Sequence, residues 1–120
     1  MEVIISREFR FDAAQALTIF PEGHQCRRLH GHSFKLVVQV RGVINPANGL
    51  LYDHAEIKQA VAPLLAIVDH SYLNEIPGLA NPTIELMCVW FWERLKDQLP
   101  GLDEIALWET PGAWCRYRGQ

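Results

Sequence analysis

The spacing of apolar residues changes twice along this chain, and this change restricts the fold more than any other feature. Residues 3–13 and 34–40 alternate between apolar and polar side chains, which is typical of half-buried strands. From Asp53 the apolar residues recur at steps of three and four, as on one face of a helix. Alternation returns over residues 105–117. The order ββααββ predicts an α+β fold, with a four-stranded antiparallel sheet and two helices on one of its faces.

One proline falls inside the first expected helix, and another falls at the start of the second. Pro63 falls inside the first helical pattern, so we expect it to kink or restart that helix. Asn81 and Pro82 suit the cap and first position of the second helix, which would run to about Gln98. Residues 84–92 are apolar on nearly every side. Such a helix needs cover on more than one side, which favours packing against another subunit.

Length and charge exclude several classes of protein. A chain of 120 residues predicts one domain, residues 1–120. The net charge of −3 argues against a basic surface that binds nucleic acid. No apolar run approaches a membrane span, and Met1 is followed by no signal-peptide pattern. Three cysteines without framework spacing suit a reducing compartment, so a cytoplasmic location is expected.

A thiol and two imidazoles lie close together just ahead of the second expected strand. His30 and His32 are two residues apart, so on a strand both project to one side. Two imidazoles on one face are half of a zinc site. Cys26 could complete that site, act as a nucleophile or base beside it, or be a small buried residue. His24 is either a further ligand or a loop residue.

Three acidic or basic groups elsewhere could also do chemistry. Glu109 continues the alternating apolar set of Ile105 and Leu107, so its carboxylate is expected on the buried face, where it needs a partner or a ligand. The alternative is a frayed strand end where Glu109 reaches water. Asp69 and His70 are adjacent at the end of the first expected helix. They could form a proton relay, or only a surface ion pair or helix cap.

Five motifs occur in order across nearly the whole chain. They are F-D-A-A-Q (11–15), P-E-G-H-x-C-x-R-L-H-G-H (21–32), D-H-x-Y-L-N (69–74), N-P-T-x-E (81–85) and E-T (109–110). Together they resemble the 6-pyruvoyl-tetrahydropterin synthase superfamily, and within it the bacterial 6-carboxytetrahydropterin synthases of queuosine biosynthesis, which share the short spacing from Cys to H-G-H. The resemblance implies a tunnelling fold, whose subunits form barrel-shaped trimers that stack into a homohexamer with substrate sites between subunits.

The resemblance also implies a role for each candidate residue. Family members hold zinc with three histidines, and two of these match His30 and His32. The other implied roles are the base Cys26, the relay Asp69 and His70, the pterin anchor Glu109, and Thr83 beside the pterin.

The chain departs from the family pattern at the third zinc ligand. The family motif F-x-A-A-H has histidine where this chain has Gln15. Gln15 shares the parity of Phe11 and Ala13, so it should still face the site. An amide oxygen is a weaker zinc donor than imidazole. Zinc could therefore bind more weakly with Gln15 and water, His24 could replace the missing ligand, or the site could be empty or impaired.

The resemblance thus implies a zinc-dependent carbon–carbon lyase. It would convert 7,8-dihydroneopterin triphosphate to 6-carboxy-5,6,7,8-tetrahydropterin, with release of acetaldehyde and triphosphate. One alternative is 6-pyruvoyl-tetrahydropterin synthase activity, and another is a catalytically impaired, pterin-binding paralogue. A last alternative makes the His24–His32 segment a closed structural zinc knuckle.

Overall fold

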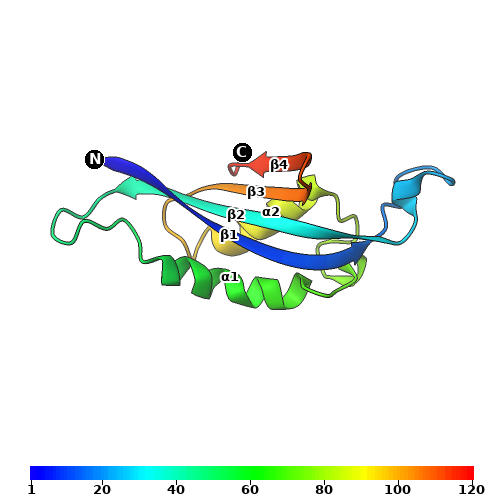
Figure 1. The fold of residues 1–120 in the computed structure, drawn as a ribbon, viewed down its shortest axis with the longest axis horizontal. Helices are drawn as coiled ribbons and strands as arrows, with labels where there is room; N and C mark the ends of the chain where they lie inside the picture. The colour runs from blue at the N-terminus through cyan, green and yellow to red at the C-terminus, as the bar shows by residue number, and fades with distance from the viewer.

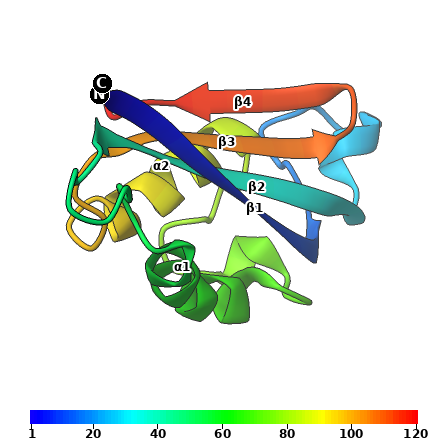
Figure 2. The same cartoon turned by 60° about the vertical axis from the view of Figure 1, so that its left-hand side comes forward.

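The computed structural model describes residues 1–120 and contains four strands and two helices (Figure 1). They are β1 (Glu2–Gln15), β2 (His30–Val43), α1 (His54–Val68), α2 (Ile84–Leu95), β3 (Leu102–Thr110) and β4 (Ala113–Tyr117). Neighbouring strands are antiparallel and lie in the order β1-β2-β3-β4. Both helices cover the same face of the sheet (Figure 2). The predicted α+β fold with ββααββ order is confirmed.

The core forms where the alternating strands meet the apolar faces of the helices. Phe11 of β1 lies directly opposite Phe34 of β2, and their rings stack with 4.9 Å between centroids. The side chains that follow on the same face of β2 are buried: Leu36, Val38 and Val40. The paired strands β1 and β2 are longer than the helices, so the subunit is elongated, measuring 58 × 23 × 23 Å (Figure 1). Both strands therefore continue beyond the core.

Helix α1 runs without interruption through Pro63, so the expected restart does not occur. Its first turn is capped by Asp53, whose Oδ1 accepts from the Ala55 N–H at 2.8 Å. Proline removes the hydrogen bond to the carbonyl of Gln59, four residues earlier. Both Pro63 and Gln59 are exposed. The unpaired carbonyl can therefore reach water, and the helix continues.

Helix α2 begins two residues later and ends three residues earlier than the sequence pattern predicted. Its cap is Thr83, whose Oγ1 accepts from the Leu86 N–H at 3.2 Å, and not Asn81. The helix ends at Leu95, and a turn leads to Gly101, which has a φ of +83°. A Cβ at Gly101 would lie 2.5 Å from the Arg41 carbonyl oxygen, so only glycine fits there.

The outer side of α2 is partly open in a single subunit. Met87, Cys88 and Phe91 are fully buried, whereas Leu86 keeps 45% of its surface exposed. Cover by another subunit therefore stays a prediction. Neither helix combines the length and apolar character needed to cross a membrane.

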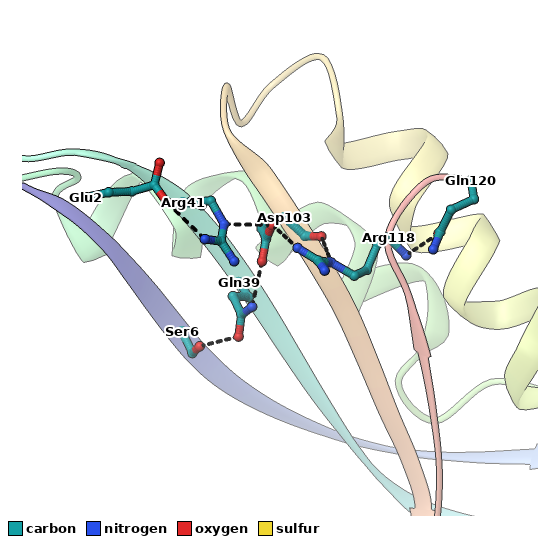
Figure 3. Close-up of polar contacts among 7 residues, drawn as sticks. All are labelled: Glu2, Ser6, Gln39, Arg41, Asp103, Arg118 and Gln120. Carbon is teal, nitrogen blue, oxygen red and sulfur yellow. Dashed lines mark hydrogen bonds and ion pairs between the residues drawn. The ribbon is translucent and has the colours of Figure 1, made fainter.

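A polar network joins the strands at the end of the sheet where β1 and β3 begin (Figure 3). Asp103 accepts hydrogen bonds from Gln39 at 2.7 Å, Arg118 at 2.6 Å and Arg41 at 3.1 Å. Arg41 also contacts Glu2 at 3.0 Å. The hydrogen bond from Gln39 and then the contact with Arg118 lower the pKa of Asp103 to about 2. Only 9% of this side chain is exposed, so β2, β3 and the chain after β4 meet at one carboxylate.

Asp103→Asn should lower the free energy of unfolding at neutral pH by about 1 kcal/mol. A carboxyl group with a lowered pKa stabilises the fold above its unfolded pKa, and this contribution disappears as the pH falls through the folded pKa. The difference between variant and wild type should therefore shrink between about pH 4 and pH 2. Denaturant titrations across that range measure it. Glu93→Gln, which breaks the exposed Glu93–Lys96 pair, is the control and should change little. Equal losses in both variants would contradict the prediction.

Candidate active site

The ends of β1 and β2 beyond the core carry Gln15, His30 and His32. Gln15 lies opposite His30 in the strand pairing, and Ala13 lies opposite His32. The His32 ring contacts the ring of Phe34, with 5.6 Å between centroids. The His30 and His32 rings meet edge to face at 5.0 Å. The same alternation that builds the core therefore places both imidazoles and the Gln15 amide on one side of the sheet.

The hydrogen bonds of His30 determine which ring nitrogen is available. Its Nδ1 lies 2.7 Å from the Arg28 carbonyl oxygen, which can only accept, so Nδ1 carries the proton and Nε2 presents a lone pair. The Gln15 Nε2 lies 3.4 Å from this His30 Nε2. Gln15 is fully buried, and its Oε1 has no hydrogen-bond partner. A half-turn of the amide would place Oε1 beside His30 instead.

This donor set fits a zinc ion. Bonds of 2.0–2.1 Å in a tetrahedral site separate the ligand atoms by about 3.3 Å, close to the observed Gln15–His30 separation. The pKa of His32 is lowered by burial and further by His30, although Glu109 acts in the opposite direction. A neutral imidazole is the form that binds a metal. Two imidazoles and one amide oxygen are therefore available, with a weaker third donor than histidine.

A cavity of about 390 Å³ adjoins these histidines. Its lining residues are Gln25, Cys26, His30, Gly31, His32 and Glu109. The Glu109 Oε2 lies 3.9 Å from the His32 Nε2, and 28% of the Glu109 side chain is exposed. The structure thus brings the Cys26 thiol, the paired imidazoles and the Glu109 carboxylate to one hollow.

Asp69 and His70 lie against the edge of β1. The Asp12 N–H donates to Asp69 Oδ1 at 3.0 Å, and the His70 N–H donates to the Asp12 carbonyl oxygen at 2.6 Å. The Asp69 Oδ1 also contacts His70 Nδ1 at 3.0 Å. The Asp12 N–H and, less strongly, His70 lower the pKa of Asp69. The Asp69 carboxylate therefore lies where it can orient the His70 imidazole.

His70 borders a different hollow from Cys26. The second cavity, of about 490 Å³, is lined by Asp12, Ala13, Ala14, Gly31, His32, Ser33, His70 and Ser71. His32 and Gly31 border both cavities, but His70 does not line the one that contains Cys26. The His70 side chain is 80% exposed. Within one subunit His70 is thus separate from the Cys26 cavity and exposed.

Two other candidate residues, Thr83 and His24, lie outside the cavity that contains Cys26. Thr83 caps α2 and lines neither cavity. His24 also lies outside the cavity that contains Cys26, and its Nδ1 accepts the Cys26 N–H at 3.0 Å. The geometry therefore favours neither His24 as a substitute zinc ligand nor a closed zinc knuckle.

Sequence reasoning missed the part played by Asn74. Its Oδ1 accepts from the Ala16 N–H at 2.9 Å, and its Nδ2 donates to the Ala16 carbonyl oxygen at 2.7 Å. This amide fixes the backbone immediately after Gln15. Its place at the end of the D-H-x-Y-L-N motif was the only signal that pointed to it.

Comparison with known proteins identifies the class. The family description for 6-pyruvoyl tetrahydropterin synthase matches residues 4–120. A solved structure of 6-pyruvoyl tetrahydropterin synthase from Caenorhabditis elegans superimposes with a TM-score of 0.89 and 26% sequence identity, covering 100% of this chain and 97% of the other. This chain therefore belongs to the 6-pyruvoyl tetrahydropterin synthase family, and the resemblance of its five motifs is confirmed.

Two relatives with the same sequence identity to this chain carry different activity names. A 6-carboxy-5,6,7,8-tetrahydropterin synthase from Synechocystis sp. is 38% identical over 120 residues, covering 95% of this chain and 92% of the relative. A dihydroneopterin monophosphate aldolase from Pyrococcus furiosus is also 38% identical, over 102 residues and 82% of each chain. The named activities of these relatives thus differ.

Asn74→Ala should lower the free energy of unfolding by roughly 2 kcal/mol, because it leaves the part-buried backbone groups of Ala16 without partners. Denaturant titration measures this loss. Asn48→Ala removes only a local hydrogen bond to Leu50 in an exposed turn and serves as the matched control. If Asn74→Ala loses no more free energy of unfolding than Asn48→Ala, then Asn74 does not hold the backbone at Ala16.

Proposed function

We propose that this chain is a zinc-dependent carbon–carbon lyase that converts 7,8-dihydroneopterin triphosphate and one water molecule to 6-carboxy-5,6,7,8-tetrahydropterin, acetaldehyde and triphosphate. The observation that carries the proposal is the single cavity shared by Cys26, the paired imidazoles of His30 and His32, and Glu109. The 38% identity to the Synechocystis synthase supports this product. A place in queuosine biosynthesis is what the resemblance of the five motifs implies for such an enzyme.

His30, His32 and the Gln15 amide oxygen would hold the zinc. Bound zinc would act as a Lewis acid that stabilises negative charge on the hydroxyl oxygens of the substrate side chain. The lone pair on His30 Nε2 and the unpartnered Gln15 Oε1 support this assignment. The amide donor leads us to expect weaker binding than by three histidines.

Cys26 and Glu109 act on opposite parts of the substrate. The Glu109 carboxylate accepts hydrogen bonds from the guanidine-like N–H groups of the pterin ring, which fixes the orientation of the ring. The ring is then anchored at one wall of the cavity, and its side chain can extend toward Cys26 and the histidines. The Cys26 thiolate removes a proton from that side chain. A positioned base of this kind typically contributes roughly 10²- to 10⁴-fold to the rate.

Asp69 and His70 complete the proton transfers from another copy of the chain. Within one subunit they open into a separate, exposed hollow, so they cannot serve the Cys26 cavity of their own subunit by direct contact. A homo-oligomer, with two stacked trimers, would bring the His70 of one subunit to the cavity of another. Thr83 would contact the pterin of another subunit in the same way, since it lines no cavity of its own subunit.

A second candidate is elimination of triphosphate alone, which gives 6-pyruvoyl-tetrahydropterin. The matching family description and the Caenorhabditis elegans structure favour it. A pterin-binding paralogue without activity is the third outcome, motivated by Gln15.

Identification of the product tests the proposal. Purified protein supplied with zinc and 7,8-dihydroneopterin triphosphate should form 6-carboxy-5,6,7,8-tetrahydropterin, detected by mass spectrometry. Cys26→Ala should abolish turnover and leave the zinc content unchanged, because the thiol is a base and not a ligand. Cys115→Ala, which removes a thiol on β4, is the control and should retain turnover. Full activity in Cys26→Ala, a different pterin product, or tight pterin binding without turnover would each reject the proposal.

Gln15→His should tighten zinc binding at least tenfold, since imidazole is the better donor. Elemental analysis and competition with a chelator measure the change without reference to activity. Gln15→Leu removes the donor while keeping a buried side chain of similar size, and should weaken zinc binding. If Gln15→His holds no more zinc than the wild type, then position 15 is not a ligand.

A further inference from the structure

The turn that carries Cys26 is held almost entirely by hydrogen bonds. Gln25–Arg27 form a single 3₁₀ turn that contains no buried residue. Such a short turn has little stability of its own, and here apolar packing adds little. The Cys26 carbonyl oxygen accepts from the Leu17 N–H at 2.8 Å. The Cys26 N–H donates to His24 Nδ1 at 3.0 Å. Both backbone groups of Cys26 are therefore occupied, one of them by a side chain.

The His24 ring is itself fixed in place. It stacks on the ring of Phe20, with 4.2 Å between centroids and 11° between the planes. Arg27 holds the backbone at Phe20, because its Nη1 donates to the carbonyl oxygens of Thr18 at 2.6 Å and Phe20 at 2.8 Å. The Arg27 N–H also donates to the His24 carbonyl oxygen at 3.1 Å. Hydrogen bonds and ring stacking thus join residues 18–24 to the 3₁₀ turn.

We infer that His24 is a positioning residue, which holds the Cys26 thiol at the substrate cavity by accepting the Cys26 backbone N–H. This inference rests on the proposed function, in which Cys26 is the base. His24 does not line the cavity, and its ring nitrogen is bonded to the Cys26 backbone, so it acts through Cys26. Proton abstraction requires a base within hydrogen-bond reach of the proton, and small displacements of a base reduce the rate strongly. Loss of the His24 acceptor should therefore lower kcat and leave KM and zinc content unchanged.

Two substitutions distinguish the effect of the hydrogen-bond acceptor of His24 from the effect of its ring stacking on Phe20. His24→Asn keeps a side-chain acceptor near the position of Nδ1, and asparagine is a preferred cap, but it loses the aromatic contact with Phe20. His24→Phe keeps the aromatic contact and loses the acceptor. His24→Phe should lower kcat about tenfold, with KM for the pterin triphosphate and zinc content unchanged. His24→Asn should stay within about twofold of the wild type.

Amide hydrogen exchange gives a readout that does not depend on turnover. The Cys26 N–H should exchange about tenfold faster in His24→Phe than in the wild type, and His24→Asn should retain the protection. Equal effects of both substitutions, or no effect of His24→Phe on exchange and kcat, would overturn the inference. If Cys26→Ala keeps full activity, the proposed function fails instead, whereas the exchange comparison still decides whether His24 holds the turn.

Discussion

The pairing of β1 with β2 is the constraint on which the rest of the structure depends. The same register that stacks Phe11 on Phe34 within the core places Gln15 opposite His30 at the end of the strands. A shift of one residue would turn every side chain of one strand to the other face. Burial of the two phenylalanines therefore also fixes the site, because the apolar side chains and the donor atoms follow one alternation along the same two strands.

Strand β1 positions two groups of candidate site residues in different ways. Its core-facing side carries Gln15 into the interior beside His30, whereas its backbone edge binds the segment that contains Asp69 and His70. A side chain and a strand edge point in different directions, so the two groups open into different hollows of one subunit. This divergence is the physical reason for proposing that a second copy of the chain completes each site.

The loop around Cys26 and the body of the fold are stabilised by different means. The body has a buried apolar core, and a carboxylate network at Asp103 joins its strands at the far end of the sheet. The Cys26 turn contains no buried residue and depends on His24 and the Leu17 N–H. A substitution in this turn can therefore change the position of the thiol without a comparable loss of global stability.

The sequence by itself determined which residues share a face. Strand alternation is local geometry, so it predicted correctly that His30 and His32 project together and that Glu109 lies on the side of Leu107. Helix limits were less predictable: Thr83 took the capping position expected for Asn81, and exposure of Pro63 let α1 continue. Only the tertiary structure decided that His70 borders a different hollow from Cys26 and that Asn74 and His24 hold backbone groups. The contacts of Asp69–His70 and of Asn74 join segments that are distant in the sequence. The contact of His24 depends on how the loop folds back on Phe20. No local pattern therefore encodes any of them.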